Sequence, residues 1–250
     1  MLTKDFVYAI ILSLKAFSKL YLQIRRGDGN MNKSLKLFVV FVALACLLVA
    51  CGGKSAAPTT IVGTYTVAGT NPDKSEYKGT LDVTASGEAY TWSWNGGEYK
   101  GVGLQQGNVV SVGWGGDECY VVSYFIGDDG ILTGKWTDMA LSGIGADVAT
   151  PTENMGEGIE GLYNAVGTNP DGSEYGCSLQ VTKKGDVYEW YWFSCGEYTG
   201  VGIQDGKVVS VSYGSENCSA ISYHVEDDGS LNATWAYVGG TDLGTEVDKR

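Results

Sequence analysis

The sequence predicts an all-β protein in which two tandem eight-stranded antiparallel up-and-down β-barrels follow an N-terminal signal segment. Three observations support this fold class. The chain holds 37 Gly but only 4 Pro, and 12% of its residues are aromatic, a mixture that suits short strands joined by tight turns. Two long stretches repeat each other. Within each stretch, short alternating runs are separated by turn residues at the spacing of a sandwich or barrel.

The N-terminal part has the features of an export signal. A basic start at Met31–Lys36 precedes an apolar run over 37–50, which ends in Leu48-Val49-Ala50-Cys51. An apolar run of this length fits a signal-peptide core better than a membrane-spanning helix, which needs about 20 residues. The segment resembles the lipobox signal of bacterial lipoproteins. That resemblance implies cleavage before Cys51, attachment of lipid to Cys51 and a membrane anchor.

Gly52 follows the cysteine where an inner-membrane retention signal would have Asp. The resemblance therefore implies the outer membrane, with the outer face of the cytoplasmic membrane as the alternative. Because a complete signal peptide begins at Met31, we expect residues 1–30 to be a mis-called extension, 31–50 the signal peptide and 51–60 a lipidated tether.

The remainder of the chain is a duplication. Residues 61–94 match 159–192 at 18 of 34 positions, and 97–148 match 196–247 at 23 of 52 positions. Two copies are too few for a solenoid, so we expect each copy to close on itself. This predicts one barrel over 61–149, a linker over 150–158 and a second barrel over 159–250.

Turn signals divide each copy into eight strands. Ser86-Gly87, Gln106-Gly107 and Asp129-Gly130 sit where tight hairpins belong. A meander of eight strands that closes on itself leaves no open edge. The expected strands of the first copy lie near 63–68, 77–84, 88–94, 98–104, 108–114, 119–126, 131–137 and 143–149.

Alternation predicts which side chains face the barrel interior. The expected inward set of the first copy is Leu81, Val83, Tyr90, Trp92, Trp94, Val102, Leu104, Val110, Val112, Trp114, Val122, Tyr124, Ile126, Leu132 and Trp136. The second copy repeats it as Leu179, Val181, Tyr188, Trp190, Trp192, Val201, Ile203, Val209, Val211, Tyr213, Ile221, Tyr223, Val225, Leu231 and Trp235.

An eight-stranded barrel can be filled by side chains or can hold one small ligand. The pattern resembles avidin-like and lipocalin-like barrels in strand count, strand length and inward Trp, and no binding residue is carried over from them. A ligand pocket would have Trp92, Trp94 and Trp136 as its walls in one barrel, and Trp190, Trp192 and Trp235 in the other. The expected inward set contains no charge or amide, whereas ligand sites normally include such groups. We therefore favour a packed interior.

Four cysteines remain in the mature chain, and outside the cytoplasm they can form disulfides. Cys177 and Cys195 are both missing from the first copy, as a bonded pair would be. The predicted hairpin also brings them close, so we predict a Cys177–Cys195 disulfide. Cys119 and Cys218 occupy equivalent, outward positions. They could bridge the two barrels, stay free or bond another molecule, and we favour the bridge.

The sequence offers little for catalysis. His224 is the only histidine, and no nucleophile accompanies it. The cysteines have no CxxC spacing, and the Asn-Asp loops at 71–76 and 169–174 are better explained as turns than as calcium ligands. We expect no enzymatic activity, cofactor or metal site.

Charge and architecture limit the partners. Without its first fifty residues the chain has 10 basic and 27 acidic residues, a net charge of −17. Such a surface repels nucleic acid. We expect a membrane-anchored envelope module that binds a protein or glycan through its outer faces and loops. The alternative is a carrier of apolar or aromatic small molecules, which a cavity of a few hundred Å³ inside either barrel would favour.

Overall fold

A computed structural model of the chain describes residues 60–154 and 158–250. This part consists of sixteen strands, and it contains no helix long and apolar enough to cross a membrane. The predicted signal segment and Cys51 lie outside the described residues. The strands are β1 (Gly63–Thr70), β2 (Glu76–Ser86), β3 (Ala89–Trp94), β4 (Tyr99–Gln106), β5 (Val109–Trp114), β6 (Tyr120–Ile126), β7 (Leu132–Asp138), β8 (Gly145–Asn154), β9 (Gly161–Thr168), β10 (Glu174–Lys184), β11 (Val187–Phe193), β12 (Tyr198–Asp205), β13 (Val208–Gly214), β14 (Ser219–Val225), β15 (Leu231–Tyr237) and β16 (Gly244–Lys249).

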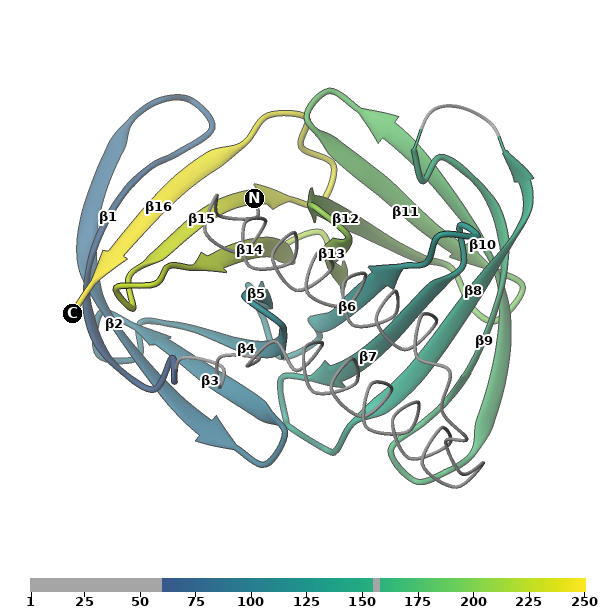
Figure 1. The fold of residues 1–250 in the computed structure, drawn as a ribbon, viewed down its shortest axis with the longest axis horizontal. Coiled ribbons are helices and arrows are strands. Elements are labelled where there is room, and N and C mark those ends of the chain that lie inside the picture. Colours follow the sequence, from purple (N-terminus) through teal and green to yellow (C-terminus); the bar gives the residue numbers. More distant parts are fainter. Residues whose placement is uncertain (1–59, 155–157) are drawn as a thin grey trace, which may run out of the picture. The chain divides into compact units, whose positions relative to one another are not determined.

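The strands form two closed antiparallel barrels of eight strands each, as predicted. Barrel A consists of β1–β5 and β14–β16, and barrel B consists of β6–β13. The last three strands of the chain therefore belong to the same barrel as the first five, so the two repeats exchange strands. Figure 1 shows this exchange, because the yellow strand β16 lies beside the blue strand β1.

The prediction that each repeat closes its own barrel is therefore wrong. Strand β5 pairs with β14 rather than β6, and β13 pairs with β6 rather than β14. Because β6 and β14 come from equivalent positions of two similar copies, either can complete the same edge, and exchanges of this kind preserve the local contacts. As a result, barrel B is contiguous in sequence and barrel A is built from the segments that flank it.

The chain passes from one barrel to the other twice, between β5 and β6 and between β13 and β14, and these two connections lie close to each other. A Cβ atom on Gly115 would lie 2.1 Å from the carbonyl oxygen of Asn217, and one on Gly214 would lie 2.2 Å from that of Glu118. Both glycines also have positive φ angles, +134° and +136°, which side-chain-bearing residues rarely adopt. The crossing point therefore requires glycine on both connections.

A disulfide joins the same two connections. Cys119 and Cys218 are bonded, with their Cα atoms 5.5 Å apart, and they lie directly before β6 and β14. The predicted bridge between barrels is thus present. The cysteines are completely buried, so the bond fixes the crossing from within the protein.

On the equivalent strands β4 and β12, the side chains alternate as expected, but the apolar residues are on the outward face. Trp92 pairs with Gly101 and Tyr90 with Gly103, so the glycines of β4 face inward, and Val102 and Leu104 face outward. A Cβ atom on Gly103 would lie 2.6 Å from the ring of Trp92, which shows that glycine makes room for the indole.

The expected inward positions of Val102 and Leu104 are therefore wrong, and so are those of Val201 and Ile203 on β12. These side chains are nevertheless buried, because they join apolar clusters outside the barrel interiors that include Val121 and Ala220.

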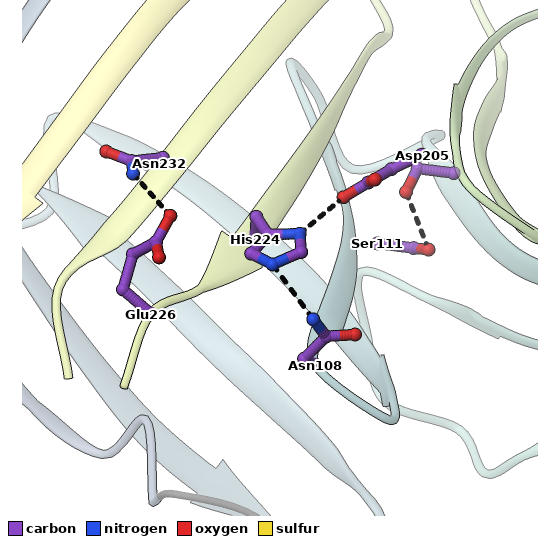
Figure 2. Close-up of polar contacts among 7 residues, drawn as sticks. Asn108, Ser111, Asp205, His224, Glu226 and Asn232 are labelled. Carbon is purple, nitrogen blue, oxygen red and sulfur yellow. Dashed lines mark hydrogen bonds and ion pairs between the residues drawn. The ribbon is translucent and has the colours of Figure 1, made fainter. Parts of the chain in front are cut away.

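Polar contacts also connect the barrels. Ser111 of β5 and Ser210 of β13, which are equivalent residues of the two repeats, share a buried hydrogen bond of 2.8 Å. His224 on β14 contacts Asp205 on β12 at 2.9 Å and Asn108 at 2.9 Å (Figure 2). The single histidine thus has a structural contact between barrels.

Candidate functional site

A pocket of about 410 Å³ opens at one end of barrel A. Its walls are aromatic, and Trp114 on β5 is their centre. The ring of Trp114 lies 5.9–6.3 Å from the rings of four other pocket residues, centroid to centroid: Trp94, Tyr99, Trp235 and Tyr237.

Glu246 supplies a carboxylate to this pocket from the first half of β16. It accepts hydrogen bonds from the hydroxyl of Tyr77 at 2.7 Å, from the indole N–H of Trp94 at 3.4 Å, and from the hydroxyl of Tyr223. All three donors are neutral. Burial and the nearby Glu246 charge raise the pKa of Tyr77, so this hydroxyl keeps its proton and remains a donor.

A second acid lies deeper in barrel A. Asp248 is two residues further along β16, on the same inward face, and it is completely buried. Its sheet neighbours are Val67 and Leu231, both apolar. Burial, together with the charge of Glu246, raises the pKa of Asp248 to about 9. At neutral pH this carboxyl therefore holds its proton and is uncharged.

Barrel B has the equivalent pocket, with a volume of about 320 Å³. Tyr213 takes the central place of Trp114, and its ring lies 4.8–5.9 Å from those of Tyr120, Trp192 and Tyr198. The remaining equivalent lining residues include Tyr175 for Tyr77, Trp136 for Trp235 and Asp147 for Glu246.

Asp147 is the acid of the barrel B pocket. It is 4% exposed, one of its carboxyl oxygens accepts a hydrogen bond from Tyr124, and the other has no partner among the described residues. Burial raises the pKa of Asp147, and the hydrogen bond from Tyr124 opposes this shift. Barrel B has no second acid, because Ala149 stands where barrel A has Asp248.

The six predicted tryptophans divide between two roles. Trp94 and Trp235 line the barrel A pocket, and Trp136 and Trp192 line the barrel B pocket. Trp92 and Trp190 are instead part of the packed cores beneath. The strand exchange also moves Trp136 into barrel B and Trp235 into barrel A, the reverse of the expected grouping.

The expectation that the interior holds no charge is wrong, since Glu246, Asp248 and Asp147 all face inward. The pairing of β15 with β16 could have revealed the inward direction of Glu246 and Asp248. Trp235 pairs with Gly244, Ala233 with Glu246 and Leu231 with Asp248, so an inward Trp235 requires inward acids. The sequence pattern hides this, because Val148 and Val247, which alternation would turn inward, are exposed and the acids beside them face inward instead.

The second predicted disulfide lies beside the barrel B pocket. Cys177 and Cys195 are bonded, with a Cα–Cα distance of 5.2 Å, and both line the pocket. In barrel A this place is taken by Gly79 and Asn95, whose side-chain oxygen accepts a hydrogen bond from the Thr80 backbone. The two pocket mouths therefore differ in covalent cross-linking as well as in composition.

The acidic loops that could have supplied metal ligands are occupied by hydrogen bonds within their own turns. The described residues include no cluster of three His, Cys, Asp or Glu side chains arranged to hold a metal ion. In the Asn-Asp loops, Asp73 and Asp171 accept hydrogen bonds from Ser75 and Ser173 within their own turns. This is the turn chemistry that the sequence indicated.

Comparisons with known protein families, curated proteins and solved structures find no match for this chain. The functional argument therefore depends on the geometry of the two pockets.

Proposed function

We propose that the protein is a lipid-anchored small-molecule binding protein of the bacterial cell envelope, with one ligand site in each barrel and no enzymatic activity. The observation that carries this proposal is the pair of equivalent pockets of about 410 and 320 Å³. Ligand sites are usually concave, mostly apolar and supplied with a few polar groups, and their volumes fall in this range. The small-molecule carrier is thus favoured over recognition through the outer faces.

Unpaired donors in the pockets support the same proposal. The indole N–H groups of Trp114, Trp136 and Trp235 are buried and have no acceptor among the described residues. All three residues line a pocket. Because a buried N–H without an acceptor is costly, a ligand oxygen that accepted such a hydrogen bond would gain affinity.

The position of the acids supports a binding role rather than catalysis. Glu246 and Asp248 lie on the same inward face of β16, but Asp248 is completely buried and is not part of the pocket lining. General acid–base catalysis needs the acid within hydrogen-bond reach of the substrate. A ligand in the pocket would contact Glu246 alone.

The location rests on the lipobox resemblance at Cys51 and on the two disulfides, which are typical of proteins outside the cytoplasm. We expect a mature chain that begins at Cys51 and carries diacylglycerol. Intact mass spectrometry of protein extracted from membranes tests this, with Cys51→Ser as the unmodified control. A soluble Cys51→Ser chain and a membrane-bound wild type are the expected result.

Native mass spectrometry of the full chain in detergent tests the binding function. We expect a co-purified small molecule, up to two per chain. Trp114→Ala should remove the barrel A ligand and Tyr213→Ala the barrel B ligand, while Tyr191→Ala, on the outer face of β11, should remove neither.

The proposal fails if native spectra show only lipidated polypeptide and no compound from a library of small amines, alcohols, acids and sugars raises the melting temperature. A glycan is the second candidate ligand. Tyr99 and Tyr237 at the barrel A pocket and Tyr198 at the barrel B pocket are each more than 40% exposed, and such rings offer broad amphipathic contact surfaces. Sugars are included in the library for this reason.

A further inference from the structure

We propose that both pockets take organic cations, with the ammonium group of the ligand held against Glu246 in barrel A and against Asp147 in barrel B. This inference rests on the proposed function and adds the charge of the ligand to it. It follows from three features of the pockets: uncompensated acids, aromatic walls and an acidic surrounding.

The acids lack basic partners. Among the described residues, the three ion pairs are Lys135–Glu88, Lys207–Asp128 and His224–Asp205, and none of them involves Glu246, Asp248 or Asp147. Lys78 lines the barrel A pocket, but its side chain is exposed and lies beyond ion-pair distance of Glu246. Buried acids are normally paired with a basic group, and each pocket has a carboxyl group that no basic side chain of the described residues pairs with.

Barrel B has unused hydrogen-bonding capacity at a residue that lines its pocket. The partnerless carboxyl oxygen of Asp147 is buried, and Asp147 is a lining residue. A carboxylate oxygen only accepts hydrogen bonds. The group that completes it must therefore be a donor, and a cationic donor forms the stronger, charge-assisted bond.

Aromatic rings surround the place where this cation would lie. In barrel A, the walls around Glu246 include Trp94, Trp114 and Trp235. In barrel B, the walls around Asp147 include Trp136, Trp192 and Tyr213. Cations are attracted to the faces of such rings, most strongly to Trp, and clusters of rings recognise ammonium ligands in this way. The same walls exclude anions, which the ring faces and the carboxylate both repel.

The ligand is therefore an amine or quaternary ammonium compound with an apolar or aromatic body that fits the remaining volume. The net charge of −17 after residue 50 would also steer cations to the protein from solution. Both repeats have an acid at the equivalent positions of Glu246 and Asp147, whereas the position two residues further holds Asp248 in one and Ala149 in the other. The feature that the two pockets share is therefore one acid each.

Three probes of similar size and different charge test this inference: 2-phenylethylammonium, 2-phenylethanol and 3-phenylpropionate. Binding to the full chain in detergent is measured by calorimetry and by tryptophan fluorescence at pH 7. We expect the ammonium probe to bind at least ten-fold more tightly than the alcohol, and the carboxylate probe to bind most weakly.

Variants assign the selectivity to each pocket. Glu246→Gln should abolish the preference for the ammonium probe in barrel A, and Asp147→Asn should do so in barrel B. Asp147→Glu, which places the acid of barrel A in barrel B, should retain it. Asp227→Asn removes the same charge from the exposed β14–β15 turn and should leave both sites unchanged. Near-UV circular dichroism verifies that each variant is folded.

Two outcomes would overturn the inference. If the alcohol binds as tightly as the ammonium probe, the pockets do not select ligands by charge. The proposed small-molecule function is then retained, but the ligand is not a cation. If no probe binds although native spectra show a co-purified molecule, that molecule is not held as a cation and again only the further inference fails.

Discussion

The substitution Asp248→Asn should stabilise the protein, and the gain should grow with pH. Asp248 is buried between Val67 and Leu231 without a hydrogen-bond partner for either carboxyl oxygen. Burial and the neighbouring Glu246 raise its pKa from 3.8 to about 9. An amide keeps the size of the side chain, needs no proton and can donate a hydrogen bond to Glu246.

The sign follows from proton binding. Between about pH 4 and pH 9, the folded chain keeps the Asp248 proton and the unfolded chain releases it. The stability of the wild type is therefore greatest below the ordinary pKa and declines as the pH rises towards 9. Each pH unit in this window corresponds to about 1.4 kcal/mol for one fully shifted group. From pH 5 to pH 8, three units at this slope, the advantage of Asp248→Asn should grow by about 4 kcal/mol at most.

Urea unfolding of the ligand-free chain at pH 5, 6, 7 and 8, followed by tryptophan fluorescence, measures this difference. The control is Asp227→Asn, an exposed change of the same kind, which should give a constant difference. A stability difference between Asp248→Asn and wild type that stays constant from pH 5 to pH 8 would refute the reasoning, because it would mean that Asp248 is ionised in the folded protein.

Three further predictions test the crossing point and the barrel B pocket. Replacing Cys119 and Cys218 by Ser should lower the free energy of unfolding by about 4 kcal/mol, since the bond closes a loop of 99 residues; urea titration measures this, and a loss below about 1 kcal/mol would contradict it. Gly115→Ala should destabilise by more than about 2 kcal/mol because of the close Asn217 carbonyl, whereas Gly116→Ala, with nothing within 4 Å, should change stability by less than about 0.5 kcal/mol. Equal melting temperatures for these two variants would be inconsistent with the crossing. Because burial raises the pKa of Asp147, binding of 2-phenylethylammonium to barrel B should weaken as the pH falls from 8 to 4 and the carboxylate becomes protonated; Asp147→Asn should remove this dependence, and a wild-type affinity independent of pH would exclude the role given to this acid.

The strands were predictable because they depend on local patterns. Turn residues and alternation placed all eight strands of the first repeat close to their observed positions, and the closure of eight strands followed from their meander. The strand exchange was not predictable in this way. Residues on β6 and β14 make the same kinds of neighbour contacts in either barrel, so the repeat pattern is identical whether or not the copies exchange strands. The pairing of β5 with β14 and of β13 with β6, which the repeat pattern does not specify, distinguishes the two arrangements.

The aromatic walls of the pockets were predictable from the sequence, but the acids were not, again because only local patterns can be read from it. Aromatic residues such as Trp94 and Trp192 follow the alternation of their own strands, so their inward direction could be read locally. Glu246 and Asp147 each precede an outward valine, Val247 and Val148, and a hydrophobic pattern that turns valine inward then suggests the wrong face for the acids. Their direction is fixed by pairing with a neighbouring strand, which is a tertiary property that overrides the local pattern.

The exchange has a consequence for the evolution of the two sites. The barrel A pocket takes Trp94 and Trp114 from the first repeat but Trp235 and Glu246 from the second, so neither repeat encodes a complete pocket. A change in the last third of one copy therefore alters the pocket whose other walls belong to the other copy. The difference between Ala149 and Asp248 is of this kind, and it gives barrel A a buried carboxyl that barrel B lacks at the equivalent position. Two sites that began as equivalents can thus acquire different pH dependence while the aromatic frame that defines both remains the same.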